Sequence, residues 1–499
     1  MRPILMIAAA GLIAAAAAAP KLDADTAAWW ATTAQLSNDA MAGRDTGSPE
    51  YMRAARLAAS KFAAAGLKPA GENGSWFQNV PMHEMRVTGA KLSAGGRPLV
   101  FLHDLTISPN EATPTNVDAP LAYGGYCRAA SLGDVRGKIV ICHGTHRAGL
   151  PGGAEREAAA RAGGAIGMLT IADPGFTVEP PRWPYAYART VTLATDAAKP
   201  DPFLRMTLNA DSLDKLLAGT GRSAETLIAA GSAGQPLPSF AVPGRFRAQF
   251  AFRQRDISSP NVLAYMPGSD PRLADQVIVL SAHLDGYGYG EPVNGDRIYN
   301  GTLDDAAYVA LLMRLAERRE GHPYRRPILF AAWTGEEKGL LGSRWFIAHP
   351  TVLKPRLAAD INLDQLRPIF PLELLTVHAL DETTLGADAR EVADSLGIEV
   401  QRDPEPDRNL LQRSDQWPFL QAGIPATAFV FGYRPGSRSE QIYRQWYRTG
   451  YHKPQDDLKQ LIDFKAAADF NRFFYKVVER VADERSVPAW KPGSTLKPN

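Results

Sequence analysis

Acidic and histidine side chains gather in residues 277–337, where apolar runs end or a helical pattern begins. They form three pairs: His283 with Asp285, Asp304 with Asp305, and Glu336 with Glu337. In open α/β folds, ligands bind beyond the carboxyl ends of the strands. We therefore expect these pairs to contribute to one site.

Taken singly, the first two pairs have simple structural explanations. His283 and Asp285 lie two apart in a strand-like run, so both can project to one side, and the carboxylate can orient the ring for a metal. An ion pair or a solvated strand end is the commoner explanation of such a pair. Asp304 opens a helical run, where the helix dipole alone accounts for an acidic residue.

The adjacent Glu336 and Glu337 follow a strand-like run and a glycine, and two such carboxylates repel unless a cation or a proton relieves them. Their side chains point differently, so one can bind a metal while the other addresses a water molecule. Asp364 ends another strand-like run, and His452 lies in the proline-containing loop YHKPQDD. Two imidazoles and three carboxylates suit two zinc ions and leave Glu336 as a free base. The candidate ligands are His283, Asp304, Glu337, Asp364 and His452.

The elements that must position these residues alternate between strand and helix. Apolar runs predict strands at 276–283, 327–334, 356–364, 372–379 and 425–432, and helical patterns cover 51–67, 303–319, 336–349 and 464–484. The first of these strands is almost entirely apolar, as expected when both sheet faces are covered. The predicted fold class is α/β, with a mixed, largely parallel central sheet flanked by helices.

A smaller, β-rich module interrupts this pattern at residues 116–243. Its short strand-like runs LAYGGY, VRGKIVICHG and AIGMLTIAD are separated by glycine-containing turns. We expect residues 20–115 and 244–499 to form the main domain around this insert. The proline-rich segment 176–188 predicts an exposed loop, with a substrate-facing role as the alternative.

The N-terminus and the composition restrict location and partners. Residues 1–19 have the layout of a secretory signal peptide, which predicts an exported, periplasmic or secreted protein without a stable membrane anchor after cleavage. The 55 basic and 53 acidic residues give a net charge of +2, which argues against a nucleic-acid partner. Cys127 and Cys142 either pair or remain two buried thiols. No pattern indicates an oligomeric state.

Six motifs together resemble those of the M28 family of zinc metallopeptidases, which includes secreted bacterial aminopeptidases and glutamate carboxypeptidases. In chain order they are AHLDG, NGTLDDAA, GEEKGLLGS, NLD, RSDQWPF and YHKPQDD. The resemblance covers most of residues 260–485, and residues 36–71 resemble the opening segment of family members. The insert resembles the family's protease-associated domain, chiefly through VRGKIVIC and RAGGAIGML. The resemblance implies a zinc-exopeptidase fold and a peptide substrate.

The resemblance also implies a role for each candidate residue. It assigns the ligands to two zinc ions: His283 and Asp364 to one, Glu337 and His452 to the other, and Asp304 to both. The catalytic roles that it implies are Glu336 as general base, Asp285 as the residue that orients His283, and Tyr451 as a hydrogen-bond partner of the tetrahedral intermediate. It further implies a cis peptide bond between Asp304 and Asp305.

Two motifs depart from the common family pattern. Residues 304–308 read Asp-Asp-Ala-Ala-Tyr where many relatives have Asp-Asn-Ala-Ser-Gly, so either aspartate is a candidate for the bridge. Residues 414–419 have Gln416 and Trp417 where many relatives have His and Tyr. That histidine is not a family ligand, so its loss bears on the shape of the pocket and not on the metals.

The predicted function is hydrolysis of N-terminal residues from peptides by an exported di-zinc aminopeptidase. One alternative is a carboxypeptidase of the same family, in which arginines bind the terminal carboxylate, although plain surface charge is the simpler interpretation of these arginines. They are Arg367, Arg402, Arg408 and Arg413. A glutaminyl cyclase would use the same fold with a single zinc ion, and a receptor-like binding module would have lost ligands. The complete ligand set favours the two-zinc hydrolase.

Overall fold

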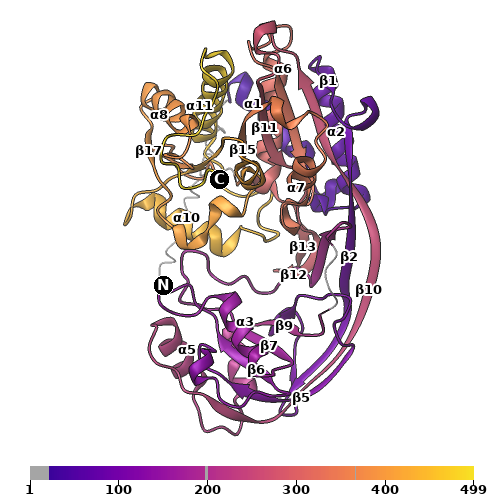
Figure 1. The fold of residues 1–499 in the computed structure, drawn as a ribbon, viewed down its shortest axis with the longest axis vertical. Helices are drawn as coiled ribbons and strands as arrows, with labels where there is room; N and C mark the ends of the chain where they lie inside the picture. Colours follow the sequence, from indigo (N-terminus) through magenta and orange to yellow (C-terminus); the bar gives the residue numbers. More distant parts are fainter. Residues whose placement is uncertain (1–21, 197–200, 366, 499) are drawn as a thin grey trace, which may run out of the picture.

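The computed structural model describes residues 22–196, 201–365 and 367–498, so the predicted signal peptide at 1–19 lies outside the described residues. The chain forms a larger and a smaller body, joined along one edge by two long antiparallel strands (Figure 1). These strands are β2 (Phe77–Ala94) and β10 (Phe240–Met266). Across the three described ranges, every helix is too short or too polar to cross a membrane.

The larger body is built on a sheet with the strand order β17-β16-β18-β15-β11-β14-β10. β11 is parallel to β14 and β15, β15 to β18, and β16 to β17, whereas β16 and β10 are antiparallel to their neighbours β18 and β14. The strands are β11 (Val277–His283), β14 (Ile328–Trp333), β15 (Leu357–Leu363), β16 (Leu374–His378), β17 (Glu399–Gln401) and β18 (Ala426–Phe431). The predicted α/β class with a mixed, largely parallel sheet is confirmed.

Helices cover both faces of this sheet. Alternate residues of β11 point to opposite sides, and both sets of side chains are apolar and packed under helices. Ile278 and Leu280 are buried in the core beneath one helical layer, and Val277 and Val279 are buried beneath the other. The first layer contains α1 (Ala24–Ser37), α2 (Pro49–Ala64), α6 (Ala307–Arg318), α8 (Thr384–Ser395), α10 (Arg438–Thr449) and α11 (Phe464–Asp483). The second contains α7 (Leu341–Ala348) and α9 (Gln416–Gln421).

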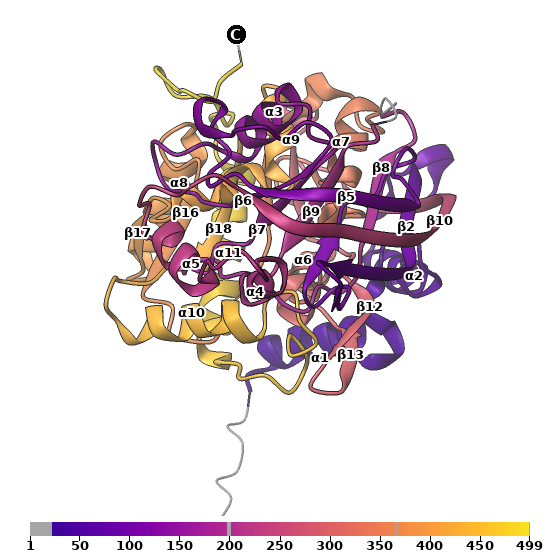
Figure 2. The same cartoon turned by 90° about the horizontal axis from the view of Figure 1, so that it is seen from below.

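The smaller body lies between β2 and β10 in the chain and has its own hydrophobic core. Four of its strands form a parallel sheet in the order β5-β6-β7-β9, which Figure 2 shows from below. They are β5 (Asn116–Tyr123), β6 (Ile139–His143), β7 (Gly167–Ile171) and β9 (Leu204–Leu208), with helices α3 (Gly153–Ala162) and α5 (Ala224–Ser232). Val87 of β2 and Phe250 of β10 also belong to this core, although both lie outside residues 116–243. The insert boundaries at 116 and 243 stay a prediction.

Cys127 and Cys142 form a disulfide within the smaller body, with their Cα atoms 5.5 Å apart. The sequence alone left this pairing open. Both cysteines are fully buried in a second small apolar cluster that also includes Leu132, Val140 and Ala160. The bond therefore joins the end of β6 to the loop between β5 and β6 inside a packed environment.

Candidate metal centre

His283 is the last residue of β11, and its side chain is 1% exposed. Its Nδ1 lies 3.1 Å from the backbone carbonyl oxygen of Asp285, and its Nε2 lies 3.2 Å from Oδ1 of Asp304. Because a carbonyl oxygen only accepts, the neutral ring carries its hydrogen on Nδ1 and presents the lone pair of Nε2. The ring is thus arranged for a ligand at Nε2.

Asp285 contacts the His283 ring through its main chain, since its carboxylate Oδ1 is 3.8 Å from Nδ1. The carboxylate instead accepts hydrogen bonds from the Thr46 hydroxyl at 2.8 Å and from the backbone N–H of Glu336 at 3.0 Å. Asp285 therefore links the end of β11 to the turn that carries Glu336.

Asp304 lies between the two candidate histidines. Its Oδ1 is 3.2 Å from Nε2 of His283, and its Oδ2 is 3.1 Å from Nε2 of His452. Asp305 is turned elsewhere, and its Oδ2 accepts the backbone N–H of His283 at 3.2 Å. The geometry thus distinguishes the two aspartates that the sequence could not.

The backbone around Asp304 is not helical. Helix α6 begins at Ala307 and not at the acidic pair as predicted, because Asp304 and Asp305 have extended φ angles of −125° and −137°. The peptide bond between them is cis, as the resemblance implied. Asp456 accepts the N–H groups of Leu303 at 2.9 Å and Asp304 at 3.1 Å, and burial raises the pKa of Asp456 to about 7. Through these two hydrogen bonds, this buried carboxylate, which the sequence did not single out, fixes the backbone that carries Asp304.

Two groups of three side chains share Asp304, and the facing atoms within each group lie within 4.8 Å of one another. One group is His283, Asp304 and Asp364, and the other is Asp304, Glu337 and His452. Oδ1 of Asp364 is 3.7 Å from Nε2 of His283, and Oε2 of Glu337 is 3.4 Å from Nε2 of His452.

The donor atoms of these groups fit a pair of cations. Oδ2 of Asp304 and Oδ1 of Asp364 are buried and have no hydrogen-bond partner among the described residues. Buried polar atoms of this kind require an explanation, such as an ion. Imidazole nitrogens and carboxylate oxygens converging at these distances are the donor set that zinc prefers.

Glu336 belongs to neither group, although its Oε2 is 3.9 Å from Nε2 of His283. Glu336 and Glu337 lie in a short 3-10 turn after β14, between the left-handed residues Gly335 (φ 65°) and Gly339 (φ 108°). Helix α7 consequently begins at Leu341 and not at residue 336 as predicted. Burial raises the pKa of both glutamates well above their usual range, and nearby carboxylates raise it further while the His283 imidazole opposes the shift.

His452 lies in the loop after α10, with a left-handed φ of 53°. The ring of Tyr451 packs on the ring of His452 with their centroids 3.8 Å apart. The hydroxyl of Tyr287, which the sequence did not single out, lies 2.9 Å from Nδ1 of His452. The Tyr287 oxygen can accept the Nδ1 hydrogen, which leaves Nε2 facing Asp304 and Glu337.

The two groups open into a cavity of about 400 Å³. Its wall includes Tyr451, together with Gln365 and His378, for which the sequence gave no cavity position. It also includes Arg182, whose segment had a substrate-facing role as its alternative prediction. Arg182 comes from the proline-rich segment of the smaller body, so part of that segment faces the cavity instead of forming an exposed loop. Among the described lining residues, the carboxylates are those of Asp304, Glu336, Glu337 and Asp364.

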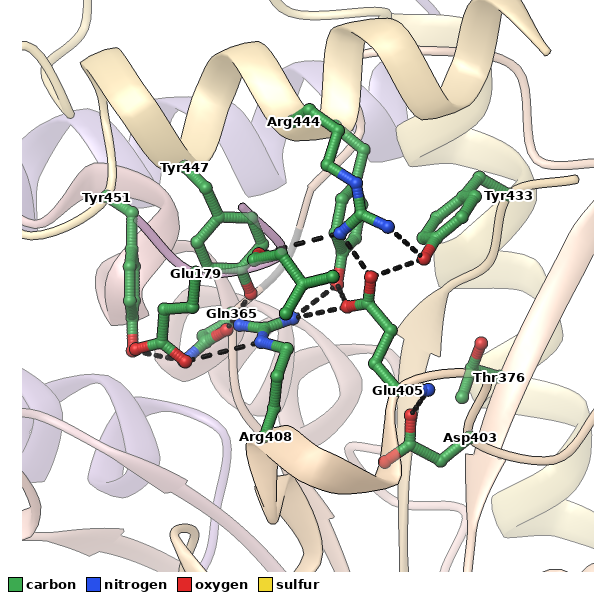
Figure 3. A network of polar contacts seen from close by, with 12 residues as sticks. Glu179, Gln365, Thr376, Asp403, Glu405, Arg408, Tyr433, Arg444, Tyr447 and Tyr451 are labelled. Carbon is green, nitrogen blue, oxygen red and sulfur yellow. Dashed lines mark hydrogen bonds and ion pairs between the residues drawn. The ribbon is translucent and has the colours of Figure 1, made fainter. Parts of the chain in front are cut away.

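Arginines, some of them buried, surround the same region. Glu179 of the proline-rich segment pairs with Arg413 at 2.8 Å and with Arg408 at 3.2 Å (Figure 3 labels Glu179 and Arg408). The surface-charge interpretation is wrong for Arg367 and Arg408, which are 0% and 2% exposed, and it holds for Arg402, whose side chain is 79% exposed. The side chain of Arg413 is 40% exposed, pairs with Glu179 and lines the cavity.

Residues 261–478 match peptidase family M28. The chain is similar to leupeptin-inactivating enzyme 1 of Streptomyces exfoliatus, with 27% identity over 210 residues, 41% of this chain and 44% of that protein. It is also similar to probable leucine aminopeptidase 2 of Aspergillus oryzae, with 24% identity over 267 residues, 49% of each chain. The chain thus spans about half the length of the curated relatives it matches.

Solved structures share the fold over nearly the whole chain. BSAP, a zinc aminopeptidase from Bacillus subtilis, gives a TM-score of 0.61 at 18% identity and covers 94% of this chain and 98% of its own. An aminopeptidase from Aneurinibacillus sp. strain AM-1 gives 0.59 at 19% identity, covering 95% and 96%. At these identities the likeness shows a common fold. Residues 261–478, which include every candidate metal ligand and Glu336, are thus similar in sequence to peptidase family M28, and the solved aminopeptidases share the fold of nearly the whole chain.

Proposed function

We propose that the chain is a di-zinc aminopeptidase that hydrolyses N-terminal residues from peptides. In this proposal His283 and Asp364 bind one ion, Glu337 and His452 bind the other, and Asp304 bridges both. The observation that carries the proposal is the pair of ligand groups that share Asp304, with Glu336 beside them and in neither. The match of residues 261–478 to peptidase family M28 supports this proposal.

The chemistry follows from the groups around the ligands. When bound, zinc polarises a carbonyl and makes water easier to deprotonate. Glu336 accepts the proton of the attacking water and passes it to the leaving amine. Asp285 holds the Glu336 turn through the backbone N–H, and Tyr451 donates a hydrogen bond to the carbonyl oxygen as negative charge develops.

The preference for a free N-terminus is supported by relatives that are described as aminopeptidases. A second candidate is a carboxypeptidase, because Arg182 and Arg413 line the cavity and could pair with a terminal carboxylate. Both guanidiniums are already paired with Glu179, which reduces the charge that they offer a substrate.

We also propose that the protein is exported and that residues 116–243 form an insert of the protease-associated type. The disulfide between Cys127 and Cys142 supports an oxidising compartment. The contribution of Arg182 to the cavity supports a role for the insert in substrate binding. The main domain would then comprise residues 20–115 and 244–499.

Metal analysis followed by chelation and zinc rescue tests the function, with free-amine and N-blocked peptides as substrates. We expect two zinc ions per chain and hydrolysis of free-amine peptides that chelation abolishes and zinc restores. Cleavage of blocked peptides alone, and of those with a free carboxyl end, would favour the carboxypeptidase. A zinc-loaded protein that cleaves no peptide but cyclises N-terminal glutamine would replace the hydrolase by a cyclase.

A further inference from the structure

A chain of hydrogen bonds leads from a buried arginine to the hydroxyl of Tyr451 in the cavity wall. Arg367 donates from Nη1 to the hydroxyl oxygen of Tyr447. That hydroxyl lies 2.9 Å from Oε1 of Gln365, and Nε2 of Gln365 lies 3.0 Å from the hydroxyl oxygen of Tyr451. Figure 3 shows Gln365 between the two tyrosines. We call these four residues the Arg367 relay.

The guanidinium of Arg367 fixes the direction of the relay, because it can only donate. The oxygen of Tyr447 accepts from it, so the single hydroxyl hydrogen of Tyr447 points to Gln365. Gln365 must then present its carbonyl oxygen to Tyr447 and its NH₂ group to Tyr451. The oxygen of Tyr451 becomes an acceptor, and its own hydrogen is left for the cavity.

Three of the four relay residues are shielded from water, and the fourth, Gln365, is half-buried in the cavity wall. Arg367, Tyr447 and Tyr451 are 0%, 1% and 2% exposed. Contacts with aromatic faces hold the guanidinium, whose central carbon lies 4.4 Å from the ring centre of Tyr443 and 5.1 Å from that of Tyr447.

The backbone of Gln365 is strained. Its φ is 60°, in the left-handed region that disfavours residues other than glycine. Such strain persists where surrounding contacts over-determine the conformation, and it gathers at functional sites. Gln365 directly follows the candidate ligand Asp364, so the strained residue connects the relay to the metal centre.

We propose that Arg367, Tyr447 and Gln365 are positioning residues that hold Tyr451 as a hydrogen-bond donor to the substrate oxygen on which negative charge develops. This inference rests on the proposed hydrolase. A donor that is already aimed at that oxygen needs no reorganisation during the reaction, so its hydrogen bond stabilises the transition state more than the bound substrate. The relay therefore acts on kcat and leaves substrate binding nearly unchanged.

Gln365→Glu tests the direction with almost no change in shape. A carboxylate accepts at both ends, so it takes the hydrogen of Tyr451 as well as that of Tyr447. We expect kcat to fall about 100-fold, the loss typical of one missing donor at a developing oxyanion, with KM changed less than about threefold. Zinc content and the melting temperature, measured on the same preparations, should match those of the wild type.

Tyr447→Phe is the matched variant without a change of charge. It disconnects Arg367 from Gln365, so the amide is free to turn its oxygen toward Tyr451, and kcat should fall by a smaller factor of about 3 to 10. Both substitutions are then repeated in Tyr451→Phe. Because the hydroxyl that they orient is missing there, each should change kcat by less than about twofold.

An undiminished effect of Gln365→Glu in the Tyr451→Phe background would overturn the relay, since the new charge would then act on its own. Full kcat in both single variants would overturn it as well. Neutron diffraction of the zinc-loaded wild type gives a readout that needs no activity. We expect deuterium on Nε2 of Gln365 facing Tyr451 and on the Tyr451 hydroxyl facing the cavity; the opposite amide orientation contradicts the relay even if the protein is a hydrolase. A wild type that hydrolyses no peptide but shows the expected deuterium positions would instead refute the proposed function alone.

Discussion

Glu336 and Glu337 are sequence neighbours with the same chemistry and different proposed roles, so the paired variants Glu336→Gln and Glu337→Gln separate a base from a ligand. Glu336 lies outside both ligand groups, whereas Oε2 of Glu337 is 3.4 Å from Nε2 of His452 within one of them. An amide cannot accept the proton of the attacking water. Loss of a general base costs about 10²- to 10⁴-fold in rate, which corresponds to about 3 to 5 kcal/mol of transition-state stabilisation.

We therefore expect Glu336→Gln to lower kcat by that factor while zinc content stays at two ions per chain. Glu337→Gln replaces a charged ligand by a neutral one, so zinc content should fall toward one ion after dialysis. Each variant serves as the control for the other, with metal analysis and steady-state kinetics on the same preparations. The reasoning is refuted if Glu336→Gln loses zinc, or if Glu337→Gln retains two ions with the affinity of the wild type.

Three further predictions concern the surroundings of the site and the insert. Tyr287→Phe removes the acceptor for Nδ1 of His452, so zinc affinity in a competition titration should fall about 10- to 100-fold; unchanged affinity would show that this hydroxyl does not orient the ring. Burial raises the pKa of Asp415 to about 7, whereas an unfolded aspartate titrates near about 4. The folded chain thus binds more protons between these values, and the stability contribution of Asp415 declines as pH rises through this window. Melting temperatures are compared in the presence of a chelator, so that metal binding does not contribute. The melting temperature of Asp415→Asn minus that of the wild type should increase from pH 5 to pH 8, and a difference that stays constant over this range would contradict the raised pKa of Asp415. Replacing Cys127 and Cys142 by serine opens a link across a sequence separation of 15, which should cost about 3 kcal/mol in denaturant unfolding; a loss below about 0.5 kcal/mol would mean that the folded insert does not depend on it.

The sequence predicted the fold class because apolar strands and amphipathic helices have clear periods. The run at 276–283 reads as a strand covered on both faces, and β11 is buried throughout. The five candidate ligands were also recognisable because they belong to short motifs, and three of them, His283, Glu337 and Asp364, lie at or just after strand ends. The structure brings all five together as two groups around Asp304.

Contacts between distant loops were not predictable from such patterns. Arg182 lies in a segment without periodicity, and only the folded chain brings it from the insert to the metal cavity. Helix starts were misplaced at Asp304 and Glu336 because the extended backbone of the aspartates and the left-handed glycines around Glu336 interrupt the helical pattern.

The sequence contains a pattern that indicates the burial of Arg367. Tyr443, Trp446 and Tyr447 recur at helical spacing on α10, and this aromatic stripe encloses the guanidinium. An arginine is ordinarily read as a surface residue, because its burial requires partners that the sequence does not display. The direction of the Arg367 relay likewise depends on a side-chain arrangement that exists only in the folded chain.

Anomalous diffraction at the zinc absorption edge, from crystals grown with zinc, tests the shared-ligand centre most directly. Two peaks should flank the carboxylate of Asp304, one beside His283 and Asp364 and the other beside Glu337 and His452. A single peak, or a peak ligated by Glu336, would contradict the division of these side chains into two sets of ligands and one free base.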